Sequence, residues 1–197
     1  MKQTSSYKEY WEERYLHGIN SGGGSYGELA EFKAEIINSF IETHNIKSVI
    51  EFGCGDGNNL ALYKIQSYVG YDISQKAIDI CKQKFWYDAG KTFGMYSTNA
   101  FIANYQFDLV LCVDVLYHVI EDTDYLILLK DIFRSTNKFV ILYTSNHYEP
   151  YIKGHIKHRN ILKDLAVYQK FFKVIKVIQN RFPEKSSSVF IILEGVK

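Results

Sequence analysis

The chain has 197 residues, of which 47% are hydrophobic and 16% aromatic, and its formal net charge is +1. This length and composition predict one globular domain over residues 1–197 with a sizeable core, and no apolar run approaches membrane-spanning length. A net charge close to zero provides no strong field that would attract nucleic acid.

The first thirty residues differ from the rest of the chain, and we expect residues 1–30 to form a lid. Aromatic residues recur at helical spacing over residues 7–15, although simple packing of an amphipathic helix explains this spacing as well. A glycine-rich segment follows at residues 20–27, and such a loop is mobile unless a ligand orders it. Apolar and polar residues alternate at helical period over residues 28–44, which predicts the helix that leads into the first strand.

A strand and a glycine-rich turn are predicted for residues 49–60, which read VIEFGCGDGNNL. The apolar run contains Glu51, and glycines then recur at every second position before what we predict to be the start of a helix. Such a turn lets the backbone approach a ligand closely, because glycine has no Cβ. The pattern E-x-G-x-G-x-G departs from the dinucleotide fingerprint G-x-G-x-x-G. It resembles the first motif of class I S-adenosylmethionine (SAM)-dependent methyltransferases.

The second strand is predicted to end at Asp72, nineteen residues after Gly53. In a β–α–β unit this spacing places a carboxylate at the carboxyl end of the neighbouring strand, where it can accept hydrogen bonds from two ribose hydroxyls. Ser74 is a favourable N-cap for a helix over residues 75–85. A short third strand is predicted over residues 96–100.

The fourth strand lies in residues 107–119, which read FDLVLCVDVLYHV and predict a buried strand followed by a turn. This stretch resembles the fourth motif of the same family, F-D-x-V-x-x-x-x-V-L-x-H-V. Because the motifs occur in the family's order and spacing, the resemblance implies the family's fold. It also implies the cofactor S-adenosyl-L-methionine, with S-adenosyl-L-homocysteine (SAH) as the product.

The last third of the chain completes the predicted fold. The expected elements are a helix over 124–134, a strand over 138–144, a loop over 145–160, a helix over 161–171 and strands over 172–179 and 188–193. Alternation of strands and helices predicts a parallel sheet with helices on both faces, and the last two strands predict an antiparallel hairpin at one edge. The fold class is therefore α/β, a doubly wound, seven-stranded, mostly parallel sheet of the Rossmann-like methyltransferase type.

The resemblance also implies which residues contact the cofactor. The glycines of the first motif would pass along the methionine portion, Glu51 would lie near the amino group, and Asp72 would bind the ribose. Asn99 stands where the family often has an aspartate that accepts a bond from the adenine amine, and its carbonyl can do the same. The full expected set is Trp11, Tyr15, Ser25, Glu51, Gly53, Gly55, Gly57, Asp72, Ile73, Asn99, Ala100 and Asp114.

Two histidines are candidates for catalysis. Methyl transfer from a sulfonium is an in-line displacement, so the protein must align the nucleophile and remove its proton if it is a hydroxyl. His118 follows Asp114 by four residues, and we weigh it as a general base, as a residue lining the pocket or as a structural residue. His147 follows the fifth predicted strand and is expected to reach the substrate.

The substrate is expected to meet the loop over residues 145–160, because this fold binds ligands beyond the carboxyl ends of strands. Residues 1–149 are acidic overall and residues 150–197 basic, which predicts an anionic small-molecule acceptor or simply a solvated basic face. An arginine offers a bidentate fork to phosphate or carboxylate. The expected substrate contacts are Tyr26, Tyr117, Tyr148, His158 and Arg159. No metal site is predicted, because the histidines lack metal-ligand spacing and Mg²⁺ on Asp114, Glu121 and Asp122 is disfavoured.

Residues 21–34, SGGGSYGELAEFKA, also resemble small methyltransferases found with bacterial surface-polysaccharide genes. This resemblance implies O-methylation of a sugar, sugar-phosphate, phosphoramidate or nucleotide-linked precursor of a surface glycan. A small-molecule N-methyltransferase, an RNA 2′-O-methyltransferase and a non-catalytic cofactor-binding subunit stay open as alternatives. We expect no nucleic-acid partner. Nucleic-acid methyltransferases that modify amino groups carry an N/D-P-P-Y/F motif after the fourth strand, and no proline follows Asp114 here. Cytosine C5 methyltransferases need a Pro-Cys nucleophile, and neither Pro150 nor Pro183 precedes a cysteine.

The expected location is the cytoplasm. The three cysteines, Cys54, Cys81 and Cys112, have neither zinc-site spacing nor the pattern of a disulfide framework, and we expect reduced thiols. The first residues do not form a signal peptide, and no membrane partner is expected.

Overall fold

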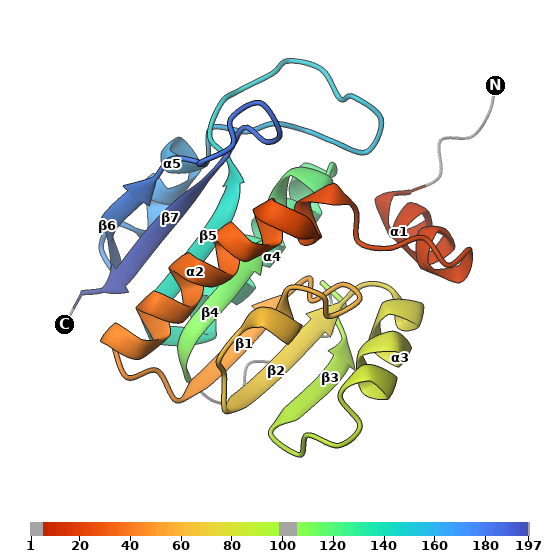
Figure 1. The fold of residues 1–197 in the computed structure, drawn as a ribbon. Helices are drawn as coiled ribbons and strands as arrows, with labels where there is room; N and C mark the ends of the chain where they lie inside the picture. The colour runs from red at the N-terminus through yellow and green to blue at the C-terminus, as the bar shows by residue number, and fades with distance from the viewer. Residues whose placement is uncertain (1–5, 99–105, 197) are drawn as a thin grey trace.

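The computed structural model describes residues 6–98 and 106–196 and contains a seven-stranded sheet in the order β3-β2-β1-β4-β5-β7-β6 (Figure 1). The strands are β1 Ser48–Phe52, β2 Ser67–Asp72, β3 Lys91–Met95, β4 Phe107–Val113, β5 Thr136–Ser145, β6 Phe172–Ile178 and β7 Ser188–Gly195. β7 pairs antiparallel with both β5 and β6, while the pairs among β1 to β5 are parallel. The predicted fold class and the predicted antiparallel pair at one edge are confirmed.

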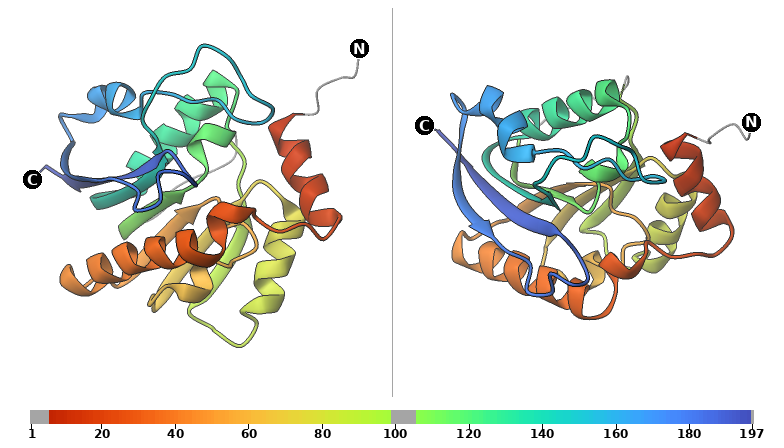
Figure 2. Two further views of the ribbon diagram at one scale, coloured as in Figure 1. Left: turned by 45° about the horizontal axis from the view of Figure 1, so that its top comes forward. Right: turned by 90° about the horizontal axis from the view of Figure 1, so that it is seen from above.

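Helices cover both faces of the sheet (Figures 1 and 2). They are α1 Tyr7–Leu16, α2 Gly27–Thr43, α3 Gln75–Lys84, α4 Asp122–Arg134 and α5 Ile161–Asp164, with 3₁₀ turns η1 Gly23–Ser25, η2 Leu60–Leu62, η3 Leu116–His118 and η4 Leu165–Tyr168. α2 and α3 pack on one face, and α4 and α5 on the other. Within the described ranges, no helix is both long and apolar enough to cross a membrane.

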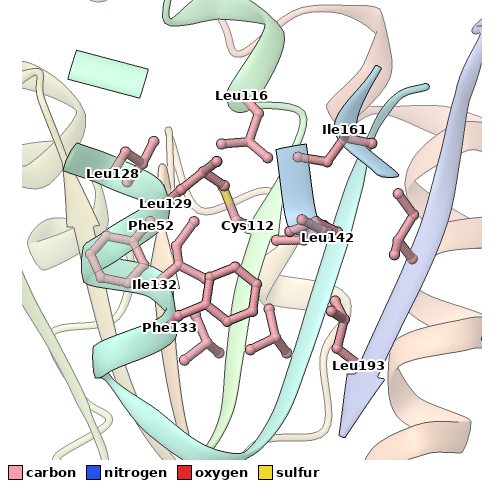
Figure 3. Packing of buried hydrophobic residues seen from close by; sticks show 14 of the residues in the cluster. Phe52, Cys112, Leu116, Leu128, Leu129, Ile132, Phe133, Leu142, Ile161 and Leu193 are labelled. Atoms are coloured by element: carbon pink, nitrogen blue, oxygen red, sulfur yellow. The ribbon is translucent and has the colours of Figure 1, made fainter. Parts of the chain in front are cut away.

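The central strands are buried on both sides because successive side chains point to opposite faces. In β4, Leu109 and Leu111 belong to the core beneath α2 and α3, whereas Val110 and Cys112 belong to the core beneath α4. Figure 3 shows the second of these cores, in which the side chains of α4 meet those of β4 and β5. The parallel pairing of β1 with β2 and with β4 places the carboxyl ends of these three strands side by side.

The third strand differs from the sequence prediction. β3 pairs with β2 through Met95, opposite Asp72, and Tyr96 then leaves the sheet. The Tyr96 hydroxyl donates to Asp131 Oδ2 (2.8 Å), so this residue packs beneath α4 instead of extending a strand. The prediction of a strand over 96–100 was wrong because β3 is an edge strand with a weakly apolar pattern. Asn99 and Ala100 lie outside the described residues.

The helix expected after the first motif is also absent from the described chain between β1 and β2. Only the 3₁₀ turn η2 forms there, and it ends at the extended residue Tyr63. Asn38 of α2 donates to the Leu62 carbonyl (2.9 Å) and accepts from the Lys64 backbone N–H (2.8 Å). These two hydrogen bonds hold the segment against α2 in its extended conformation. The helix predicted over 161–171 is likewise shorter, and consists of α5 followed by η4.

Candidate active site

A cavity of about 270 Å³ opens at the carboxyl ends of β1, β2 and β4, beneath α1 and the glycine-rich segment. The view from above in Figure 2 shows α1 beside this end of the sheet. The cavity is lined by Tyr7, Tyr10, Trp11, Arg14, Tyr15, Ser21–Ser25, Phe52–Asp56, Asn59, Asp72, Ile73, Tyr96, Thr98, Val113–Val115, Tyr117–Val119, Asp124, Leu128 and His155. The cavity therefore lies where an α/β sheet of this kind binds its ligand.

The first motif forms one wall through backbone that only glycine adopts easily. Gly53, Gly55 and Gly57 have φ values of 85°, 55° and 70°. A Cβ on Gly55 would lie 2.6 Å from Ser21 Oγ, so the absence of a side chain permits the glycine-rich segment to pack closely against the turn. Gly57 does not line the cavity; a Cβ there would lie 2.7 Å from the Phe85 ring, so this glycine permits packing against the residues at the end of α3.

Gly53 is the tightest position of the turn, and Gly53→Ala is expected to destabilise the fold by about 1–3 kcal/mol. A Cβ would lie 2.1 Å from Val115 Cγ2, and the φ of 85° adds backbone strain. Gly18→Ala is the control that measures backbone strain without a steric clash, because Gly18 has a φ of 71° and nothing lies within 4 Å of the added Cβ. Urea unfolding should show a larger loss for Gly53→Ala than for Gly18→Ala, and Val115→Ala should recover part of it. Equal losses would contradict the steric argument.

Asp72 ends β2 and faces the cavity beside Ile73. Its Oδ2 accepts from the Gly55 N–H and its Oδ1 from the Ser74 N–H, both at 2.9 Å. Burial raises the pKa of Asp72 to about 6, against the lowering effect of these backbone donors. Each carboxylate oxygen has a second lone pair, so the residue fixes the turn and still offers acceptors to a ligand.

The helix α1 is held on both sides of the cavity. Glu12 of α1 accepts from the Ser74 hydroxyl (2.6 Å) at the start of α3. On the other side the Tyr7 hydroxyl donates to Asp124 Oδ2 (2.8 Å) in the first turn of α4. α1 thus spans from α3 to α4 above the sheet.

The glycine-rich segment is tied to the first motif through Asp56. Asp56 Oδ2 accepts from the Ser21 N–H (2.9 Å) and from the Tyr26 hydroxyl (2.8 Å). Ser25 is held in turn by Asn58 and Asn59, whose side-chain amides donate to its carbonyl and hydroxyl oxygens. Asn59 Oδ1 is buried in the cavity lining without a partner among the described residues. An unpaired acceptor at this position is available to a donor on a bound ligand.

The inner end of the cavity carries a buried ion pair. Asp114 follows β4 with a φ of 60°, pairs with Lys33 of α2 and accepts from the Tyr117 hydroxyl (2.7 Å). Glu51 lies behind this pair and does not line the cavity. It accepts from the Tyr68 hydroxyl (2.5 Å), and burial raises the pKa of Glu51 to about 7.

Histidines and aromatic rings form the outer wall. His118 packs edge-on against Trp11, with ring centroids 4.9 Å apart, and His155 stacks on Tyr10 at 4.2 Å. His118 Nδ1 lies 3.2 Å from the His155 carbonyl oxygen, which fixes Nδ1 as the donor and leaves Nε2 as an acceptor. Burial lowers the pKa of His118 to about 4, so the ring is neutral at physiological pH.

Several predicted substrate residues lie outside the cavity. Tyr26 is occupied by Asp56, and Tyr148 is exposed. The Arg159 guanidinium donates to Asp122 and to the Val119 carbonyl and stacks over Tyr125 at 4.1 Å. Arg159 therefore secures the loop to the start of α4, and its fork is not free for an anion. His147 and His158 lie next to each other, with ring centroids 4.4 Å apart, away from the cavity.

Sequence reasoning overlooked Arg14 and His155. Arg14 lies on the same helical stripe as Tyr7, Tyr10, Trp11 and Tyr15, and all five line the cavity. Its Nη1 donates to the Tyr10 hydroxyl (3.3 Å) and its Nε to the Asn20 carbonyl (2.7 Å). It has no carboxylate partner in residues 6–98 and 106–196. The i, i+3, i+4, i+7 spacing of this stripe was the available signal.

This fold, with the glycine turn after β1 and the acid at the end of β2, defines the class of SAM-dependent methyltransferases. A family model described as a methyltransferase domain matches residues 26–175. The chain belongs to this methyltransferase family, and its cofactor is SAM. No curated protein matches the chain.

Solved structures share the fold at low sequence identity. The N-methyltransferase NodS from Bradyrhizobium japonicum WM9, in complex with SAH, has a TM-score of 0.78 and 12% identity, with 98% of this chain and 100% of NodS covered. Magnesium protoporphyrin IX methyltransferase (ChlM) from Synechocystis PCC 6803 with bound SAH has a TM-score of 0.70 and 16% identity, with 95% and 97% covered. The methyltransferase domain of bacterial CtHen1-C has a TM-score of 0.66 and 18% identity, with 82% and 96% covered.

Proposed function

We propose that the chain methylates a small anionic acceptor, by O-methylation of a sugar, sugar-phosphate, phosphoramidate or nucleotide-linked precursor of a bacterial surface glycan. The observation that carries this proposal is the outer wall of the cavity. There a neutral histidine offers an acceptor, and Arg14 supplies a cation without a carboxylate partner among the described residues. The cover formed by α1 favours a small acceptor over a macromolecule.

In this proposal the cofactor occupies the inner part of the cavity. Asp72 binds the ribose, Gly53 and Gly55 pass along the methionine portion, and Asn59 Oδ1 accepts from the amino group. Tyr15 and Ser25 close this part from the lid, and Asp114 lies beside the acceptor. SAM supplies a methyl group already activated by its positive sulfur, so the protein's tasks are alignment, exclusion of water and proton removal.

His118 is proposed as the group that accepts the proton of the acceptor hydroxyl. Its Nδ1–H is held by the His155 carbonyl, so the Nε2 lone pair is directed by a fixed ring. Trp11 and Tyr117 pack against this ring and restrict its rotation. The role of His147 in catalysis is not supported by its position outside the cavity.

His118→Asn is expected to lower kcat about a hundredfold, because it removes Nε2 and keeps a donor for the His155 carbonyl. SAH affinity should change little, since the ring lies at the outer wall. Because the pKa of His118 is lowered to about 4, its neutral form persists above pH 5, and kcat should show no loss from this group between pH 5.5 and 8. The matched control is His17→Asn, an exposed histidine at the end of α1. Unchanged kcat in His118→Asn would contradict the proposed role.

The proposal is tested by titrating SAH into the purified chain and then screening acceptors with labelled SAM. Methyl transfer to sugar phosphates or nucleotide sugars, reduced in Arg14→Gln through a raised KM, supports it. Transfer to amines alone would replace O-methylation by N-methylation, and transfer to RNA with steep salt dependence would overturn the small acceptor.

We also propose a cytoplasmic location without a nucleic-acid partner; the free buried thiols Cys54, Cys81 and Cys112 fit a reducing compartment.

A further inference from the structure

We propose that His147, Glu149 and His158 form a binding site for a divalent transition-metal ion of the zinc class, outside the cavity described above. One ligand atom from each residue can be chosen so that all lie within 4.8 Å of one another. All three residues are partly buried, with the side chains of His147 and Glu149 41% and 30% exposed. This inference is independent of the acceptor proposed above.

The fold builds the cluster by closing the loop between β5 and α5. Asn146 and Asn160 form an isolated antiparallel bridge, which brings the two ends of the loop together. Asn146 Oδ1 accepts from the Leu162 N–H (3.1 Å), and Asn160 caps α5 through the Lys163 N–H (3.2 Å). These contacts place His147 and His158 next to each other, although the two residues are eleven positions apart in the sequence.

The distance between two of the ligand atoms matches the spacing expected on a tetrahedral ion. With metal–ligand bonds of about 2.0–2.1 Å, two ligands of a tetrahedron lie about 3.4 Å apart. His147 Nε2 lies 3.5 Å from Glu149 Oε1, close to this spacing, and one nitrogen of His158 belongs to the set of ligand atoms that lie within 4.8 Å of one another. Two histidines and one glutamate are a known zinc ligand set that leaves a fourth position for water.

An ion pair between a protonated His147 and Glu149 is the alternative explanation of the cluster. It does not account for His158, whose Nδ1 is buried and has no hydrogen-bond partner within the described part of the chain. A buried imidazole nitrogen without a partner is costly, and a metal ion would satisfy it. His158 is therefore the residue that separates the two explanations.

The site would act on the loop that completes the outer wall. The same loop carries His155, whose carbonyl holds His118, and the Lys157 N–H donates to the Tyr117 carbonyl (2.8 Å). An ion bound at the base of the loop would fix both of its ends. Because binding to the folded state alone stabilises it, the ion would raise the unfolding temperature and protect the loop from proteolysis.

The experiment is a titration of the EDTA-treated full chain with Zn²⁺ in competition with a chromophoric chelator. We expect one site in the wild type and at least tenfold weaker binding in His158→Ala and in the conservative Glu149→Gln. His155→Ala is the control, because it removes a histidine of the same loop that is not in the cluster. Circular dichroism without zinc shows whether each variant folds.

Thermal unfolding and limited proteolysis provide a second readout. Zinc should raise the unfolding temperature of the wild type and of His155→Ala, and should slow cleavage of residues 147–159 in both. Neither effect should occur in His158→Ala. Equal zinc affinity in the wild type and in folded His158→Ala, or no binding beyond that of the buried thiols Cys54, Cys81 and Cys112, would overturn the proposal.

Discussion

Replacing Asp72 with alanine is expected to weaken SAH binding at least a hundredfold. In the proposed site its carboxylate accepts two hydrogen bonds from the ribose, and bonds to a charged acceptor contribute about 1.5–3 kcal/mol each. The side chain also holds the Gly55 and Ser74 N–H groups, so its loss loosens the first motif. Calorimetric titration measures the effect, and Asp79→Ala, an acid on α3 away from the cavity, is the control.

The pH dependence of the same affinity provides an independent check. Because burial raises the pKa of Asp72 to about 6, the free protein becomes protonated at this residue as the pH falls below 6. A protonated carboxyl has lost one acceptor, so SAH should bind more weakly at pH 5 than at pH 7. Asp72→Asn keeps the shape and one acceptor oxygen, and should remove this pH dependence. A wild-type affinity independent of pH would contradict the ribose contact.

The central part of the fold could be predicted because its signals are local. β4 is apolar on both faces, and the glycines at 53 and 55 mark a turn with positive φ, so periodicity and backbone chemistry identify them without an alignment. The edge strand β3 carries no such signal, because its residues are only partly buried. The helix that is missing after the first motif depends on another kind of signal, since Asn38 from the distant helix α2 makes two hydrogen bonds with the backbone of that segment.

The parts of the site that were not predicted depend on contacts between distant segments. The guanidinium group of Arg159 is of a type that binds anions, but its donors are already bonded to Asp122 and to two backbone carbonyls. His158 shows the same limit, because the bridge between Asn146 and Asn160 brings it to His147. Residue type indicates what a side chain is able to bind, and the tertiary partner decides whether it is available.

The buried ion pair beneath the cavity is the other feature with a large expected effect. Lys33 is 0% exposed within α2, and it pairs with Asp114, whose second oxygen accepts from Tyr117. Its Nζ also lies 5.4 Å from the centroid of the Tyr143 ring. Lys33 further opposes the burial that raises the pKa of Glu51 to about 7. One cation therefore compensates two carboxyl groups behind the proposed methyl-transfer position.

Lys33→Met is accordingly expected to destabilise the fold by about 3–5 kcal/mol, because it preserves the apolar stem and leaves Asp114 without its counter-charge. Urea unfolding followed by circular dichroism measures the loss, and Lys82→Met, an exposed lysine of α3, should change stability by less than about 0.5 kcal/mol. The double variant Lys33→Met/Asp114→Asn should recover more than half of the loss, since it removes the uncompensated charge as well. Such recovery would show that the lost stability comes from the uncompensated buried charge. A double variant as unstable as Lys33→Met would instead assign the loss to packing in α2 and refute the electrostatic role of the pair.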